Sequence, residues 1–214
     1  MPRTALLVGA TGLVGVALLD RLLAAPDYAQ VVVLGRRAPS RAHPKLRAMT
    51  STLEDLDALA DPLAADDLFC CLGTTTRAAG GKAGLERVDY HMVLAVARAA
   101  QAGGVTRFFG VSAAGASATS PAFYSRVKAR MERAVGEVGF AAVHLFRPSL
   151  LLGARSESRP GEALAQKLAP LLAPLCIGPL RKYQPITAAE VADAMLQVAR
   201  SDTRSGTVIH DLPL

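Results

Sequence analysis

The sequence predicts an α/β protein built on a doubly wound parallel sheet, and three observations support this. Short apolar runs alternate with helical stretches, as in consecutive strand–helix–strand units. Several runs are apolar throughout, which is typical of strands covered on both faces. A glycine-rich segment directly follows the first run. We therefore expect a single domain over residues 1–214, with a small C-terminal substrate lobe at roughly 154–187.

The pattern assigns the elements in order along the chain. Breaks at Pro26, at Gly103 and Gly104, and at Gly139 mark the ends of helices. After Gly153 prolines recur, so this region is predicted to hold the substrate lobe. Strands are expected at 4–8, 30–35, 46–50, 68–73, 106–112 and 141–148, and helices at 13–25, 85–101, 123–138 and 188–200, with one helical turn at 53–59.

Composition limits the classes of function. Hydrophobic residues make up 51% of the chain, which allows a sizeable core without disulfides, and the three cysteines are predicted to be core residues. No Cys-x-x-Cys or His-x-x-x-His spacing indicates a metal site, so no metal is expected. The uncharged stretch 5–19 is interrupted by glycine and is shorter than the ~20 residues that span a bilayer. We expect a cytoplasmic protein with neither signal nor membrane anchor.

The segment "VGATGLVG" joins the first expected strand to the first expected helix. In this context the first glycine permits a tight turn, the second lets backbone N–H groups approach a pyrophosphate, and the third allows close helix packing. The helix N-terminus adds partial positive charge. The segment therefore predicts a dinucleotide site formed by Gly9, Thr11, Gly12, Leu13, Val14 and Gly15.

The end of the second strand indicates which dinucleotide binds. An acidic residue there would bind the ribose 2′-hydroxyl of NAD, but this chain has Arg36 and Arg37. Two guanidiniums suit a 2′-phosphate, so NADP(H) is the predicted cofactor. A solvated basic loop is the alternative. Nucleic-acid binding through the basic cluster 36–47 is less favoured, because the chain has no Trp and few other aromatic residues to stack on bases.

Tyr124 and Lys128 stand four positions apart on the expected helix 123–138. Side chains with this spacing share a helix face, with Cβ atoms about 5–6 Å apart. Tyr124 could then donate a proton to a developing alkoxide, Ser112 could hydrogen-bond the same oxygen, and Lys128 could lower the pKa of the phenol. The alternative is a solvent-exposed helix face whose aromatic side chain packs inward, with no catalytic role for the pair.

Five segments occurring in order carry a family resemblance: "GATGLVG", "CCLGTTTRAAGGKAGLERVDY", "VSAAGAS", "YSRVK" and "FRPSLLLG". With them the chain resembles the atypical short-chain dehydrogenase/reductases, and most of all the Tat-interacting-protein group of oxidoreductases. The resemblance implies a Rossmann-like fold that binds NADP, with Ser112, Tyr124 and Lys128 on the catalytic positions. It also implies that Cys71, Leu72 and Gly73 run along the cofactor and that Pro148 lies near the nicotinamide.

Two departures from the family pattern matter. The chain contains no Asn, so the Asn that completes the family's usual tetrad is missing from the preceding helix, where Asp89 and His91 stand. In addition, "VSAAG" has Ala113 where relatives often have a second serine, which leaves open whether Ser112 stands one position from the functional residue.

The favoured function is an NADP(H)-dependent oxidoreductase that transfers hydride to or from a small carbonyl or alcohol. The alternative is an NADPH-sensing regulatory or scaffold protein that binds a protein partner and has little or no turnover. The long helices at 85–101 and 123–138 could pair across a homodimer.

Overall fold

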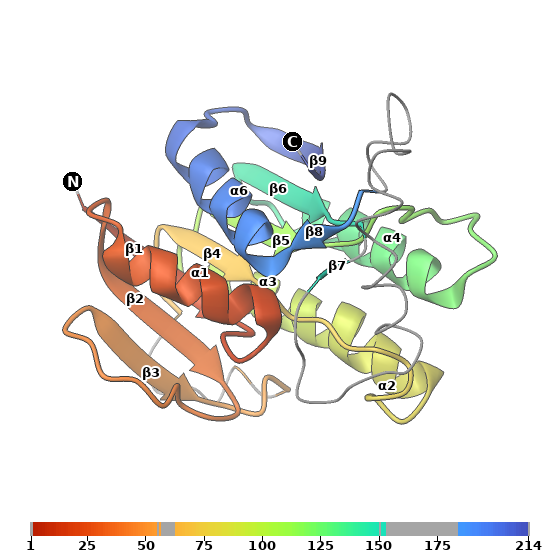
Figure 1. Cartoon of the computed structure of the whole chain (residues 1–214), viewed down its shortest axis with the longest axis horizontal. Helices are drawn as coiled ribbons and strands as arrows, with labels where there is room; N and C mark the ends of the chain where they lie inside the picture. Colours follow the sequence, from red (N-terminus) through yellow and green to blue (C-terminus); the bar gives the residue numbers. More distant parts are fainter. Residues whose placement is uncertain (1, 55, 57–62, 150, 153–183, 214) are drawn as a thin grey trace.

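The computed structural model describes residues 2–54, 56, 63–149, 151–152 and 184–213. Its main sheet has the strand order β3-β2-β1-β4-β5-β6-β9, and every neighbouring pair is parallel (Figure 1). The strands are β1 (Arg3–Val8), β2 (Tyr28–Gly35), β3 (Leu46–Thr50), β4 (Asp67–Cys70), β5 (Arg107–Val111), β6 (Ala142–Arg147) and β9 (Gly206–Asp211). A short parallel pair joins β7 (Leu151–Leu152) to β8 (Ile186–Thr187).

Helices cover both faces of this sheet. On one face α1 (Leu13–Ala24) packs beside α6 (Ala188–Ser201) (Figure 1). The other face carries α4 (Phe123–Gly136) and a continuous helical stretch composed of α2 (Lys82–Glu86), the π-helix η1 (Arg87–Met92) and α3 (Val93–Ala102). No helix among the described residues is long and apolar enough to cross a bilayer.

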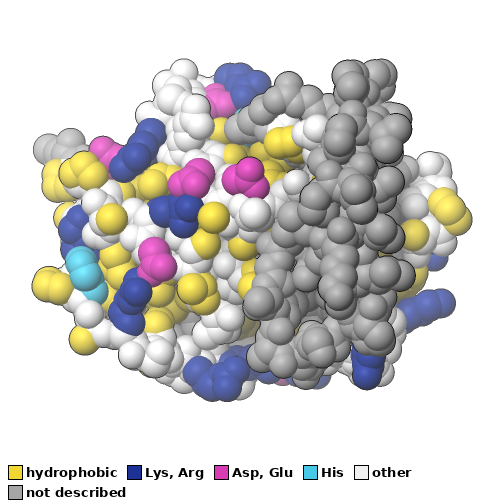
Figure 2. All heavy atoms as spheres, in the orientation of Figure 1, with side chains coloured by type: hydrophobic (Ala, Val, Ile, Leu, Met, Phe, Trp, Pro, Cys, Tyr) yellow, Lys and Arg dark blue, Asp and Glu magenta, His cyan; other side chains and the backbone are white. Residues whose placement is uncertain are grey.

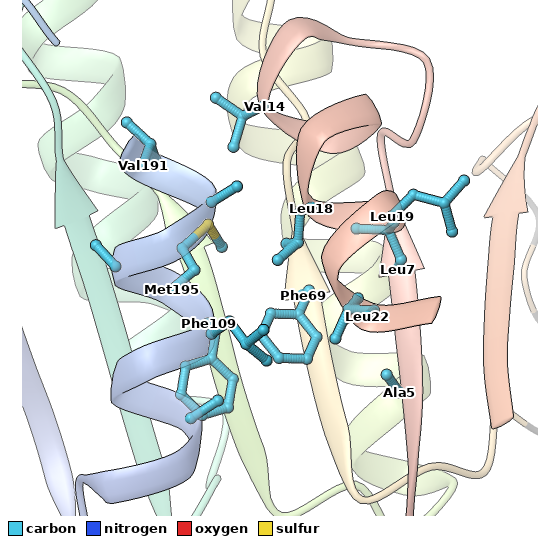
Figure 3. Packing of buried hydrophobic residues seen from close by; sticks show 14 of the residues in the cluster. Ala5, Leu7, Val14, Leu18, Leu19, Leu22, Phe69, Phe109, Val191 and Met195 are labelled. Carbon is cyan, nitrogen blue, oxygen red and sulfur yellow. The ribbon is translucent and has the colours of Figure 1, made fainter. Parts of the chain in front are cut away.

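The alternation of side chains along the strands divides the core into two layers. In β1, Leu7 faces α1 and α6, while Leu6 faces the opposite layer. Leu18 of α1, Met195 of α6 and Phe69 of β4 belong to one buried cluster between these two helices and the sheet (Figure 3). Fully burying a side chain such as Leu18 stabilises the fold by about 1.5–3 kcal/mol. The two layers therefore hold the carboxyl ends of the strands at fixed positions.

On the outer surface of the layer that contains α1 and α6, acidic and basic side chains are mixed (Figure 2). Arg21 of α1 donates two hydrogen bonds to Asp193 of α6, at 2.5 and 2.8 Å. Because the Asp193 side chain is exposed, this pair contributes little to stability, but it aligns the two helices.

The amino end of the sheet is closed by a buried ionic network. Arg3, Tyr28, Asp67 and Arg107 are the first residues of β1, β2, β4 and β5. The Asp67 carboxylate is fully buried and accepts hydrogen bonds from the Tyr28 hydroxyl at 2.6 Å, from Arg3 at 3.1 Å and from Arg107 at 2.6 and 2.8 Å. Burial and the neighbouring Asp67 carboxylate raise the pKa of Tyr28, so its hydroxyl stays protonated and keeps donating.

The predicted fold class is confirmed, and strand 46–50 has the predicted bounds. The expected strand 68–73 ends at Cys70, because the chain turns there toward the glycine-rich loop. The expected helix 85–101 begins at Lys82 and is interrupted by η1. Strand β9 was not expected, because "GTVIHD" is short and half polar, as edge strands often are. The helical turn 53–59 and the lobe 154–187 lie largely outside the described residues.

Candidate functional site

The glycine-rich loop follows β1 as expected, and two of its glycines are required by the packing of the chain itself. Gly9 adopts φ +83°, and a Cβ atom there would lie 2.6 Å from the carbonyl group of Cys71. A Cβ at Gly15 would lie 2.0 Å from the carbonyl oxygen of Gly9. Both positions therefore exclude any side chain, whether or not a ligand binds.

Gly12 differs from these two, because the packing of the chain would allow a side chain at this position. It caps the N-terminus of α1 with an ordinary extended backbone, and the nearest atom to a Cβ there would be the Gly9 oxygen at 3.4 Å. The space beside Gly12 is what a pyrophosphate would need at the N-terminus of α1. Thr11 is exposed and Leu13 partly so, whereas the Val14 side chain packs into the core (Figure 3), so only its backbone could contact a cofactor.

A pocket connects this loop to the end of β2. Arg36 and Arg37 belong to its lining, and the lining residues that the structure describes include no acidic one. The other described lining residues come from the glycine-rich loop, from the end of β2 and from two further segments: they are Gly9, Ala10 and Thr11; Val33, Leu34 and Gly35; and Leu53 and Leu72. The pocket therefore brings the two arginines next to the glycine-rich loop.

The segment Cys71, Leu72 and Gly73 links the two halves of the site. The Cys71 carbonyl packs against Gly9, and Leu72 lines the arginine pocket. A Cβ at Gly73 would lie 3.6 Å from Asp89 Oδ1 and 3.9 Å from Lys128 Nζ. One short stretch of chain therefore runs from the glycine-rich loop to the expected catalytic lysine.

Tyr124 and Lys128 lie in the first two turns of α4, beyond the carboxyl end of β5. The Lys128 ammonium lies 5.9 Å from the centre of the Tyr124 ring and donates a hydrogen bond to the Val111 carbonyl at 3.2 Å. The Lys128 side chain is only 2% exposed and forms an ion pair of 2.8 Å with the fully buried Asp89. Burial alone would lower the pKa of Lys128, but Tyr124 and the Asp89 carboxylate outweigh it and raise this pKa.

Ser112 directly follows β5, and its hydroxyl is already engaged. It donates a hydrogen bond of 2.5 Å to Glu132 Oε1, and Glu132 in turn accepts two hydrogen bonds from Arg147, at 2.8 and 2.5 Å. The Arg147 guanidinium is stabilised by this carboxylate, and its pKa is raised. A hydroxyl has one hydrogen to donate, so Ser112 would have to leave Glu132 before donating to a substrate oxygen. The role expected for Ser112 stays a prediction.

The structure also places the remaining predicted residue and adds some that the sequence did not single out. Pro148 follows β6, and its carbonyl accepts a hydrogen bond from Ala114 N–H at 2.8 Å, which puts it beside the loop after β5. Glu132 was not predicted, although its spacing of four from Lys128 places it on the same helix face. The sequence placed Asp89 on its helix without indicating its contact with Lys128, which it makes from within a π-helical turn.

One group of possible metal ligands occurs in the described part of the chain: His144, Asp202 and His210. His144 Nδ1 lies 3.1 Å from His210 Nε2 and 3.8 Å from Asp202 Oδ2. Burial lowers the pKa of His144 to about 4, so it is neutral at pH 7. Arg204 already donates hydrogen bonds to both oxygens of the Asp202 carboxylate, and its positive charge would repel a nearby divalent cation. The expectation of a metal-free protein stays a prediction.

A family model described as NAD(P)H-binding matches residues 9–150, the part of the chain that contains the glycine-rich loop and the Tyr124–Lys128 helix. The chain belongs to this NAD(P)H-binding family. Among curated relatives, protein HTATIP2 of Rattus norvegicus is 38% identical over 169 residues, which cover 77% of this chain and 69% of that protein. Protein fmp52-1, mitochondrial, of Aspergillus terreus is 36% identical over 169 residues, covering 76% and 73% of the two chains. These relatives confirm the resemblance to the Tat-interacting-protein group.

Solved structures of low identity share the fold of this NAD(P)H-binding family member. DesIV, a dTDP-glucose 4,6-dehydratase from Streptomyces venezuelae with NAD and DAU bound, has a TM-score of 0.72 at 20% identity and covers 97% of this chain and 74% of its own. MoeE5 in complex with UDP-glucuronic acid and NAD has a TM-score of 0.71 at 18% identity, with coverage of 96% and 75%. These likenesses show a Rossmann-like fold.

Proposed function

We propose that the protein is an NADP(H)-dependent oxidoreductase that transfers hydride to or from a small carbonyl or alcohol. The continuity of the site carries this proposal: the segment Cys71–Gly73 joins the arginine pocket to the Lys128 ammonium. A dinucleotide lying along that segment would have its adenosine end at Arg36 and its nicotinamide end beside Tyr124 and Lys128. Tyr124 would protonate the developing alkoxide, and Lys128 would hold the nicotinamide ribose.

Preference for NADP(H) over NAD(H) follows from the charges in the pocket. A 2′-phosphate would gain charge-assisted hydrogen bonds from Arg36 or Arg37, whereas no carboxylate among the described lining residues would bind a free 2′-hydroxyl. Fluorescence titration with NADPH and NADH tests this. Arg36→Ala should weaken NADPH binding by about tenfold or more and leave NADH binding within about twofold.

Arg41→Ala is the matched control. Arg41 lies in the same loop but forms an ion pair with Asp20 and is not part of the pocket lining. It changes net charge by the same amount, so the ratio of NADPH to NADH affinity should not move. Equal losses in the two variants would show that the loop acts only through its overall field and would contradict a 2′-phosphate site.

A second function is supported by the state of the catalytic groups. The Ser112 hydroxyl is held by Glu132, and the Lys128 charge is offset by Asp89. Both features suit an NADPH-binding regulatory protein with little turnover. NADPH consumption stimulated by a panel of aldehydes, ketones and quinones, and lost in Tyr124→Phe, would establish the enzyme. NADPH binding without such consumption in the wild type would favour the sensor.

The surroundings of the protein are also proposals. We propose that the protein is cytoplasmic and that it binds a protein partner. We also propose a homodimer that forms through the helices 85–101 and 123–138. The name of the Aspergillus terreus relative contains the word mitochondrial, so cell fractionation that separates cytosol from mitochondria is the direct test of location.

A further inference from the structure

The buried ion pair of Asp89 and Lys128 lies on a turn with unusual geometry. Residues Arg87–Met92 form a π-helix between two α-helical segments, and Asp89 and Met92 are its buried residues. A π-helical turn is uncommon and changes the direction of the side chains that follow it, often at functional sites. Here it accompanies an acidic side chain that points into the protein.

Both partners of this pair are held in place by the backbone. Asp89 Oδ2 accepts a hydrogen bond from the Thr74 N–H at 2.9 Å, while Oδ1 lies 2.8 Å from Lys128 Nζ. Lys128 also donates to the Val111 carbonyl. An ammonium has three N–H donors, and among the described residues one hydrogen bond, to the Val111 carbonyl, and the ion pair with Asp89 engage it. A remaining donor could reach a ribose hydroxyl, and Gly73 leaves the adjoining space without a side chain.

The charge of Asp89 has an electrostatic consequence for Tyr124. The carboxylate lies 2.8 Å from the Lys128 ammonium and makes the pair neutral overall, so Tyr124 experiences a dipole and not an isolated cation. A phenol with a reference pKa of about 10 then stays protonated at neutral pH.

We propose that Asp89 is a positioning residue that holds Lys128 in place and offsets its charge, and that it thereby preserves Tyr124 as a neutral proton donor. It stands on the helix from which the Asn is missing, but unlike an Asn it carries a charge. Under the proposed oxidoreductase function, on which this step rests, the arrangement favours carbonyl reduction, which needs the phenol, over alcohol oxidation, which needs the phenolate.

Other ionisable groups around the pair leave this balance unchanged. Glu132 and Arg147 compensate each other. Burial raises the pKa of the Cys70 thiol to about 11, so it is uncharged at pH 7. Among the described residues, the further charged or titratable groups on the elements packed around the pair are ion-paired, exposed or in contact with a ring: Glu86 with Arg130, Arg87 with Glu54, Arg133 with Glu137 and Arg107 with Asp67; Lys82, His91 and Arg98 at the surface; Tyr90 beside Arg130 and Arg126 beside Phe123. Burial also raises the pKa of the Cys71 thiol, so it is uncharged as well.

The test is a spectroscopic titration of Tyr124 that needs neither cofactor nor substrate. Because the chain has no Trp and four Tyr, the near-ultraviolet absorbance of phenolate is easily resolved, and subtracting Tyr124→Phe isolates one residue. In Asp89→Asn the midpoint for ionisation of Tyr124 should fall by about one pH unit. In the double variant Asp89→Asn with Lys128→Met it should return close to the wild-type value.

The outcomes separate this inference from the proposed function. An unchanged or higher midpoint in folded Asp89→Asn overturns it, whatever the turnover assays show. A lower midpoint supports it even if no substrate is turned over, in which case only the oxidoreductase proposal fails. Should Asp89→Asn not fold, Asp89→Ser keeps an acceptor for the Thr74 N–H without the charge and is subject to the same criterion. Circular dichroism verifies folding of each variant.

Discussion

The two ends of the parallel sheet each hold a fully buried carboxylate, and the two are used differently. At the amino end, Asp67 is surrounded by two guanidiniums and a phenol, which provide four hydrogen bonds. At the carboxyl end, Asp89 has one ammonium and one backbone N–H. A carboxylate such as Asp67, whose hydrogen bonds come from side chains of several strands, contributes to holding those strands together. A sparsely bonded one leaves its partner with bonding capacity for a ligand, and this distinguishes the site from the scaffold.

The largest expected effect tests this difference through stability. Removing one member of a buried ionic network costs about 3–5 kcal/mol, because the remaining charges lose their partner. Asp67→Ala should therefore lower the free energy of unfolding by roughly 4 kcal/mol. Asp89→Ala should lower it by about half as much, because it deprives only one ammonium and one backbone N–H of their partner. Urea unfolding followed by circular dichroism measures both, and a larger loss for Asp89→Ala would reverse the assignment of the two ends.

The next effect separates packing from binding within the glycine-rich loop. Gly15→Ala forces backbone to move and should cost about 3 kcal/mol of stability. Gly12→Ala should change stability by less than about 1 kcal/mol, because its Cβ meets only an ordinary contact. It should nevertheless weaken NADPH binding by about tenfold, since the methyl group occupies the expected pyrophosphate position. Thermal unfolding and fluorescence titration on the same samples check the pair. Unimpaired binding by Gly12→Ala would place the pyrophosphate elsewhere.

The smallest effect concerns pH and a third buried group between the two ends. His144 has a pKa of about 4 in the folded protein, because burial opposes its charge, against about 6.5 when unfolded. As pH falls below 6.5, the unfolded chain takes up a proton that the folded chain does not. Stability should therefore drop by about 2 kcal/mol between pH 7 and pH 5 and stop falling from this source below pH 4. The lowered pKa of His210 acts in the same direction.

His144→Gln should flatten this pH dependence, while the exposed His91→Gln should leave it unchanged. Urea midpoints measured at pH 7 and pH 5 give the comparison. If both variants retain the full wild-type slope, the acid sensitivity arises from the carboxylates and not from the imidazole pair.

The sequence was sufficient for the features that depend on local patterns. The apolar strands, the helix ends at glycine and proline, and the glycine-rich loop follow from periodicity and backbone conformation, and the structure confirms them. The four-residue spacing of Tyr124 and Lys128 similarly placed both on one helix. What could not be predicted depends on contacts between distant segments. Asp89 contacts Lys128 from a π-helical turn on a different helix, and Glu132 contacts Ser112 because β5 and α4 pack together.

The position of β1 in the sheet also has a consequence for how the protein folds. Among the described strands, β1 precedes the others in the sequence and lies in the middle, between β2 and β4, whereas β9 follows the others and closes an edge beside β6. Because every pairing is parallel, each needs a crossover, and contacts between residues far apart in sequence dominate. Such topologies fold slowly, on the order of milliseconds to seconds or longer. The edge of β6 therefore stays open until β9 has been made, which makes it the surface that a folding chaperone would have to protect.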